Sequence, residues 1–134
     1  MALLRVAVGA LALLLAGCGD AGGRGSERQT IMSDHGLLRI EVRPTPDPPV
    51  RGDNVVQLVI TNAAGAPVDG LQLDAQPWMP AHGHGTSVIP TVTAQGGGQY
   101  QLDHVYLYMA GTWELRLAFT GTESDTATPA FSVP

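Results

Sequence analysis

The sequence has 134 residues, enough for one domain, and carries seven Lys and Arg against twelve Asp and Glu, a net charge of −5. This balance leaves no basic stripe to neutralise phosphates and excludes a nucleic-acid partner, while the single cysteine excludes an internal disulfide and a site built from several thiolates. The 17 glycines and 10 prolines, together with few charged residues, predict short strands and turns rather than helices.

The chain begins with a targeting segment. Arg5 supplies a positive charge, residues 6–15 form an apolar run, and two small residues precede Cys18. This layout is typical of a secretory signal, and the apolar run is too short to span a membrane as a helix.

The tetrapeptide Leu-Ala-Gly-Cys at residues 15–18 resembles the lipobox of bacterial lipoproteins. The resemblance implies that residues 1–17 are removed and that Cys18 is acylated and becomes the first residue of the mature chain. An ordinary cleaved signal followed by a chance cysteine is the alternative. The acyl chains would anchor the protein to a membrane of the cell envelope, facing the periplasm or the exterior. Gly19 follows where Asp is the usual inner-membrane retention signal, which favours the outer membrane.

Residues 18–36 are predicted to be the acylated cysteine and a flexible tether. After Cys18 the composition is mainly Gly, Ser, Asp, Glu, Arg and Gln, with too little apolar surface to order itself. Met32 and His35 lie in this stretch, and we interpret them as solvated tether residues rather than as additional ligands.

Residues 37–134 are predicted to form an all-β domain. Apolar and polar residues alternate with a period of two in several short runs, which is typical of strands with one buried face. Seven such strands separated by turn signals predict a seven-stranded antiparallel immunoglobulin-like β-sandwich. The fourth strand contains Pro90 and is expected at a sheet edge. The predicted strands span residues 38–43, 55–61, 71–76, 86–94, 100–107, 113–119 and 127–133.

Successive antiparallel strands alternate between the two ends of a sandwich, and this brings separate loops together. The turn at residues 77–85, the corner at residues 108–111 and the loop at residues 44–52 should therefore lie at one end. Met109 is then expected close to the histidine-rich turn, about thirty residues earlier in the chain.

The chemistry-bearing groups concentrate in that turn. Met79, His82 and His84 lie within six residues, and the glycines beside the histidines allow backbone angles that other residues avoid. Two imidazoles with one or two thioethers, Met79 and Met109, suit Cu(I) better than zinc, which usually recruits a carboxylate or thiolate. From spacing alone, a solvated turn with both methionines filling the end of the core is an equally good interpretation.

Two further residues could support such a site. His104 shares strand parity with residues that should face inward, so it is either a ligand, a group behind the ligands, or a buried histidine with a local hydrogen bond. Trp78 either shields the site or contacts a partner from the surface.

No enzymatic pattern emerges from the sequence. A Gly-x-Ser-x-Gly element is missing, and Asp69, Asp74 and Asp103 are scattered without pairing for acid–base work. The glycines at residues 96–98 lie between strands and predict a hairpin turn rather than a phosphate cradle. The protein is therefore expected not to be an enzyme.

Two motifs in order, Met-Pro-x-His-Gly-His-Gly at residues 79–85 and Met-Ala-Gly-Thr-Trp at residues 109–113, resemble the YtkA-like domain, a relative of the FixH-like proteins. The resemblance extends over residues 37–133. It implies a small extracytoplasmic sandwich domain, with a connection to copper handling in some members. The ligands that the resemblance implies are Met79, His82, His84 and Met109.

These observations predict a lipid-anchored copper-binding accessory protein that buffers copper or delivers it to a receiving envelope protein. A metal-free β-sandwich interaction module of an envelope assembly is the alternative.

Overall fold

The computed structural model describes residues 25–134, which form ten strands and no helix. The signal segment and Cys18, on which the lipoprotein prediction depends, lie outside the described residues. No helix in the described part is long and apolar enough to cross a membrane. The strands are β1 (Gln29–Met32), β2 (Leu38–Thr45), β3 (Gly52–Asn62), β4 (Leu71–Met79), β5 (His84–Gly85), β6 (Thr91–Gly96), β7 (Gln99–Leu107), β8 (Gly111–Gly121), β9 (Asp125–Ala127) and β10 (Ala130–Val133).

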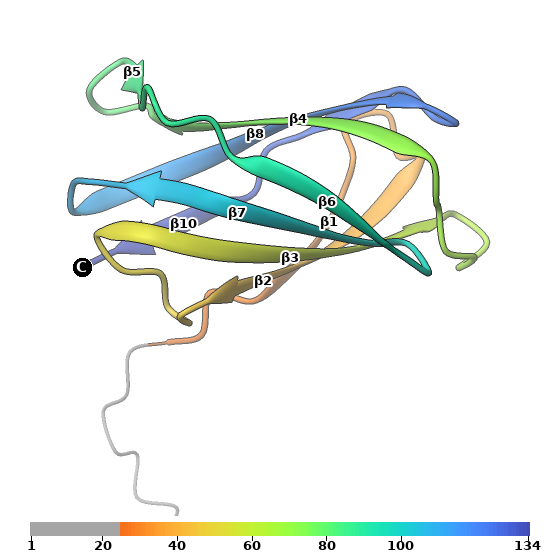
Figure 1. Ribbon diagram of the computed structural model, residues 1–134, viewed down its shortest axis with the longest axis horizontal. Helices are drawn as coiled ribbons and strands as arrows, with labels where there is room; N and C mark the ends of the chain where they lie inside the picture. The colour runs from red at the N-terminus through yellow and green to blue at the C-terminus, as the bar shows by residue number, and fades with distance from the viewer. Residues whose placement is uncertain (1–24) are drawn as a thin grey trace, which may run out of the picture.

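The strands form two antiparallel sheets that face one another, as the predicted sandwich requires (Figure 1). One sheet has the order β1-β2-β3-β7-β6, and the other has the order β10-β8-β4-β5 with β9 paired to β8. The chain crosses between the sheets at the corner between β7 and β8. Residues on either side of this corner therefore belong to different layers.

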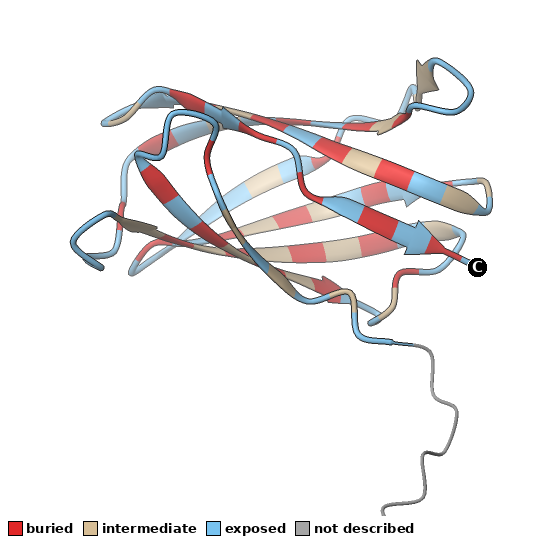
Figure 2. Cartoon of the chain, turned by 180° about the vertical axis from the view of Figure 1, so that it is seen from behind, coloured by how far each residue is buried: buried red, intermediate tan, exposed pale blue. Residues whose placement is uncertain are grey.

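The core lies between the sheets and follows the alternation read from the sequence (Figure 2). In β8, for example, every second residue from Trp113 to Phe119 is buried while its neighbours are more exposed. Side chains of opposite parity face outward because successive residues of a strand point to opposite faces. The largest fully buried side chains are Trp113, Tyr100, Phe119, Phe131, Leu38, Ile40, Leu58, Ile60, Met79, Leu102, Leu107 and Leu115.

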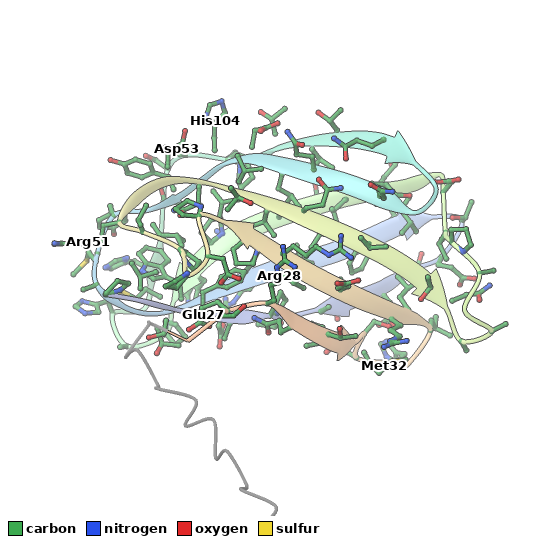
Figure 3. All side chains as sticks on the ribbon, turned by 90° about the horizontal axis from the view of Figure 1, so that it is seen from below. Glu27, Arg28, Met32, Arg51, Asp53 and His104 are labelled. Atoms are coloured by element: carbon green, nitrogen blue, oxygen red, sulfur yellow. The ribbon has the colours of Figure 1, made fainter. Side chains whose placement is uncertain are left out.

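The tether prediction is wrong over its last part, because β1 lies within it. Gln29 to Met32 pair with β2 as an edge strand of the first sheet. Ile31 of this strand is partly buried against the core, but four residues carry too little alternation to predict a strand. Met32 is 51% exposed on this strand, and it is labelled far from Arg51 and His104 in Figure 3.

The turn between β1 and β2 is fixed by Asp125, whose side chain is buried. Its carboxylate accepts hydrogen bonds from the backbone amides of His35 and Thr126 and lies 2.8 Å from the His35 ring nitrogen Nδ1. Burial alone would raise the pKa of Asp125, but hydrogen bonds from Ser33, His35 and these amides outweigh it and hold the pKa well below its usual range. His35 is thus part of the folded domain rather than of a tether.

The remaining differences from the predicted strands occur at prolines and at the histidine turn. The fourth predicted strand begins only after Pro90, at β6, and this strand does lie at a sheet edge. The last predicted strand is divided into β9 and β10 on either side of Pro129. The short strand β5 was not predicted, because two residues carry no periodicity.

Candidate metal centre

The histidine turn is a tight reversal between β4 and β5. The backbone amides of His82 and Gly83 donate to the carbonyl of Met79 at 3.1 and 3.0 Å. Gly83 has φ of 66°, which favours glycine, so the chain can return at once as β5. In the resulting register Met79 lies directly opposite His84.

This register brings one thioether and one imidazole to the same place. Residues directly opposite on neighbouring antiparallel strands point to the same face, with Cβ atoms about 4.5–5.5 Å apart. Met79 is 2% exposed and points into the core, so His84 faces the same side at the open end of the sandwich, where it is half-buried. The pair is therefore set by the strand register.

The two imidazoles are close to one another. Their ring centroids are 5.5 Å apart, and the ring planes are inclined at 54°. Two imidazoles bound to one ion, with metal–nitrogen bonds of about 2.0–2.1 Å, have centroids about 5–6 Å apart. The observed separation of His82 and His84 thus fits a shared ion, with His82 on the exposed side.

The corner between β7 and β8 adjoins this turn, as the strand alternation predicted (Figure 1). The hydroxyl of Tyr108 lies 2.9 Å from Nδ1 of His84, and the two rings stack with centroids 5.8 Å apart. A Cβ at Gly111 would be 2.6 Å from the terminal methyl group of Met79, so the first residue of β8 lies against the Met79 side chain. Besides β4 and β5, the corner between β7 and β8 and the first residue of β8 therefore contribute to the site.

Met109 belongs to this corner, and its side chain is half-buried against the core. Its carbonyl accepts a hydrogen bond of 2.9 Å from the indole nitrogen of Trp113, which is completely buried. The ring of Trp113 also meets Tyr108 edge to face, with centroids 5.4 Å apart. One core tryptophan therefore holds the corner that carries both Tyr108 and Met109.

His104 is not part of this site, and the parity argument for it was wrong. A β-bulge lies between the pairs Asn54–Val105 and Val56–Leu102, so two residues of β7 oppose one residue of β3. His104 occupies the bulge with φ of 62°, which turns it outward and turns Val105 inward. Its Nδ1 lies 3.2 Å from the Asp53 carboxylate, and both side chains are exposed (Figure 3). The local hydrogen bond was anticipated, but the burial was not.

Trp78 lies on the outer face of its sheet, since its neighbour Met79 points inward. It is half-buried, and the Arg116 guanidinium covers its ring at 4.4 Å from the centroid, a cation–π contact. Gly85 lies opposite it on β5. Trp78 therefore supports the turn from behind rather than closing over the histidines.

The donors at this end are imidazoles, thioethers and a phenol. Within residues 25–134 no three side chains among His, Cys, Asp and Glu come together as metal ligands. An ion held by His82 and His84 would therefore complete its coordination with Met79, with Met109 or with solvent. Soft thioether donors favour Cu(I), whereas zinc sites usually include a thiolate or carboxylate and magnesium sites use oxygen ligands.

Tyr108 is the residue that the sequence analysis missed. It precedes Met109 in the corner predicted to meet the histidine turn, so its position alone could have identified it. Its alternation with Leu107, which is buried, marks it as outward-facing. Because β7 ends at Leu107 and the chain turns there, Tyr108 instead reaches across the end of the sandwich to His84.

The fold and this end of the molecule define a small antiparallel β-sandwich domain with a methionine and histidine cluster at one end. The sequence profile of the YtkA-like family matches residues 35–118, and the chain belongs to this family. Among solved structures, the Lin-41 filamin domain is similar at 16% identity and a TM-score of 0.48, covering 69% of this chain and 91% of that one. No curated protein matches the chain.

Proposed function

We propose that the protein is an extracytoplasmic copper-binding accessory protein that buffers Cu(I) or delivers it to a receiving envelope protein. The observation that supports this most is the convergence of Met79, His82 and His84 with the corner that carries Met109. The separation of the two imidazoles suits one shared ion, and a thioether lies directly across the strand pair.

The donor chemistry supports copper over other metals. Thioethers prefer Cu(I), and imidazoles bind copper in either oxidation state. Methionine and histidine also stay usable in an oxidising compartment, where free thiols do not persist. The site would therefore suit a protein exported by the signal at residues 1–17 and tethered through an acylated Cys18.

Exposure of the site supports exchange rather than permanent storage. His82 is exposed at the tip of a glycine-flanked turn, while Met79 is buried beneath it. A receiving protein could approach His82 first and withdraw the ion outward. Because the lipid tether would confine both proteins to the membrane surface, transfer would not require a large docking interface.

The test is a Cu(I) competition titration of residues 19–134, comparing wild type with the His82→Ala/His84→Ala double variant. We expect the double variant to lose affinity by at least about 100-fold, equivalent to about 2.7 kcal/mol. The matched control is His35→Ala/His104→Ala, which removes two imidazoles outside the cluster and should keep wild-type affinity. Equal affinity of wild type and His82→Ala/His84→Ala would refute the proposal.

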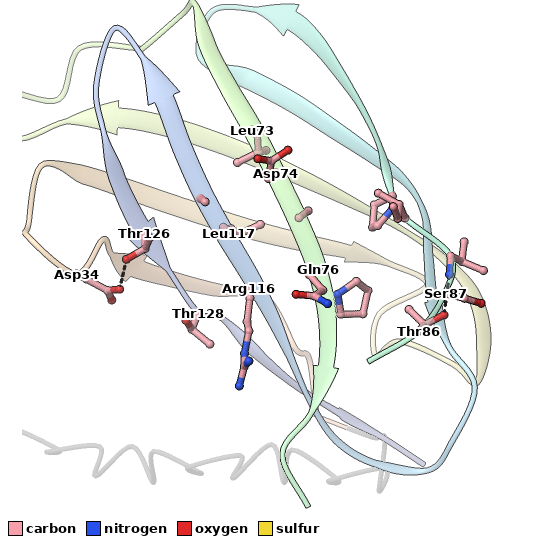
Figure 4. Close-up of a pocket in the computed structure, with 16 residues that line it drawn as sticks. Asp34, Leu73, Asp74, Gln76, Thr86, Ser87, Arg116, Leu117, Thr126 and Thr128 are labelled. Carbon is pink, nitrogen blue, oxygen red and sulfur yellow. Dashed lines mark hydrogen bonds between the residues drawn. The ribbon is translucent and has the colours of Figure 1, made fainter. Parts of the chain in front are cut away.

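A metal-free interaction module is the second candidate, and one surface feature favours it. A groove of about 620 Å³ is lined by the middle of β4, by residues 86–90 after β5 and by parts of β8 and β9 (Figure 4). Ile89, 80% exposed, and Val88, 38% exposed, belong to its lining. Photo-crosslinking from position 89 in native envelopes should capture a partner under this alternative, whereas position 95 on β6 is the control. Capture at position 89 without copper binding would favour the module.

A further inference from the structure

We propose that Tyr108 is a positioning residue that holds His84 with its proton on Nδ1, so that Nε2 is the nitrogen presented to the metal. This inference rests on the proposed function. The sequence patterns that identify the cluster do not include Tyr108, and its role follows from contacts at the end of the sandwich.

Two oxygen atoms face Nδ1 of His84. The Tyr108 hydroxyl oxygen lies 2.9 Å from it, and the carbonyl oxygen of Gly85 lies 3.3 Å from it. A carbonyl oxygen only accepts hydrogen bonds, while a hydroxyl oxygen both donates and accepts. Both contacts are satisfied together only when Nδ1 carries the proton and donates to them. In the neutral ring, the lone pair is then on Nε2.

Tyr108 is held between two aromatic side chains. Its ring stacks on His84 with an angle of 16° between the planes, and it meets the edge of Trp113. Trp113 is completely buried, and its indole nitrogen donates to the Met109 carbonyl. The phenol therefore has a fixed position relative to the core, although its hydroxyl end lies near solvent. This contact orients His84 from the corner between β7 and β8, which Trp113 joins to the core.

The hydrogen bond at Nδ1 determines how His84 is oriented toward a metal ion. Metal-binding histidines usually donate their other ring nitrogen to an oxygen, which fixes the tautomer and the ring plane. Here the Gly85 carbonyl is too distant to do this well alone, at 3.3 Å, so most of the orienting effect falls to Tyr108. Removing the hydroxyl frees the ring to rotate and to exchange tautomers.

The test uses Tyr108→Phe, which keeps the aromatic ring and removes only the oxygen. The first measurement is nitrogen-15 NMR of the imidazoles in metal-free protein. We expect wild-type His84 to be in the Nδ1–H tautomer, and Tyr108→Phe to show a mixture of both tautomers. The second measurement is Cu(I) affinity, which should fall about 10–100-fold in Tyr108→Phe.

The matched control is Tyr106→Phe. Tyr106 is 39% exposed against 40% for Tyr108, and it stacks on Tyr108 at 6.5 Å without a hydrogen bond to His84. This variant should keep the wild-type tautomer and affinity. Unfolding midpoints of both variants identify any general loss of structure.

The outcomes separate the two proposals. If wild type binds Cu(I) and Tyr108→Phe has the same His84 tautomer and the same affinity, the positioning role is refuted while the proposed function stands. If wild type does not bind Cu(I), the proposed function is refuted and the metal-directed role of Tyr108 with it. A wild-type tautomer with the proton on Nε2 would overturn the inference directly.

Discussion

Substitution of Gly111 by alanine tests whether the buried thioether of Met79 is a ligand. The added Cβ would lie 2.6 Å from the Met79 methyl group, whereas carbon atoms in contact are about 3.5–4.0 Å apart. The methyl group must therefore retreat by about 1 Å, and the rotation about the Cγ–Sδ bond that allows this also turns the lone pairs of the sulfur. Met79 is 2% exposed, so this movement takes place inside a packed core.

Two costs contribute to the expected loss of stability. Gly111 has φ of 128°, and a side chain in this region costs about 1–3 kcal/mol. The shift of the Met79 methyl group adds less than the about 1–3 kcal/mol typical of overpacking, because this group is the free end of a flexible side chain. For a domain of this size, each kcal/mol lowers Tm by about 4–8 °C. The turned lone pairs of the sulfur should also weaken Cu(I) binding by at least about tenfold, or about 1.4 kcal/mol.

Gly52→Ala is the control for the backbone contribution. Gly52 has φ of 105°, and nothing lies within 4 Å of the Cβ that alanine would add. It should lose only the backbone part of the stability and bind Cu(I) as wild type does. Urea denaturation and Cu(I) competition measure both effects. If Gly111→Ala and Gly52→Ala agree in stability and in affinity, the assignment of Met79 to the site is wrong.

Two further predictions concern regions away from the cluster. His104→Gly should stabilise the domain by about 0.5–1 kcal/mol in urea denaturation. Relief of strain in the left-handed backbone should outweigh the larger entropy of glycine in the unfolded chain and the loss of an exposed contact with Asp53. A loss of stability would show that the bulge is not strained. The folded state holds the pKa of Asp125 below its usual range, so stability should be full above about pH 4 and fall below it, as the unfolded chain binds the proton more readily. In acid titrations followed by circular dichroism, Asp125→Asn should lack this pH-dependent contribution, and an unchanged profile would contradict the assignment.

The alternation of apolar and polar residues along the sequence is enough to predict most of the strands and inward-facing residues of this sandwich. The inward positions of β8, from Trp113 to Phe119, and of β4, which includes Met79, follow from a period of two without any knowledge of partners. The same alternation placed the histidine turn and the Met109 corner at one end, and the contact of Tyr108 with His84 confirms their proximity. The residues of a strand that face the core can be predicted from the sequence of that strand alone, because successive side chains point to opposite faces.

Strand β1 and the β-bulge at His104 depend on backbone pairing between strands, and the alternation of residue types does not predict them. Strand β1 is a short edge strand held by pairing with β2 and by the partly buried Ile31, and its four residues are too few to show a period of two. The bulge at His104 inserts one residue and reverses the parity of the next part of β7. A period of two assumes an unbroken ladder, so one extra residue was enough to turn a predicted inward histidine toward solvent.

The cluster itself combines both kinds of information. The strand register pairs Met79 with His84 within one sheet, whereas the hydroxyl of Tyr108 comes from the corner that joins β7 to β8. An unfolded chain would hold only the closely spaced donors of the turn, and the Tyr108 contact exists only when this corner is folded against the turn. Binding of an ion at this end would therefore favour the packed sandwich as well as the turn, because a ligand that binds the native state stabilises whatever structure its site requires. The position of the Tyr108 corner relative to the histidine turn thus controls how well His84 is presented.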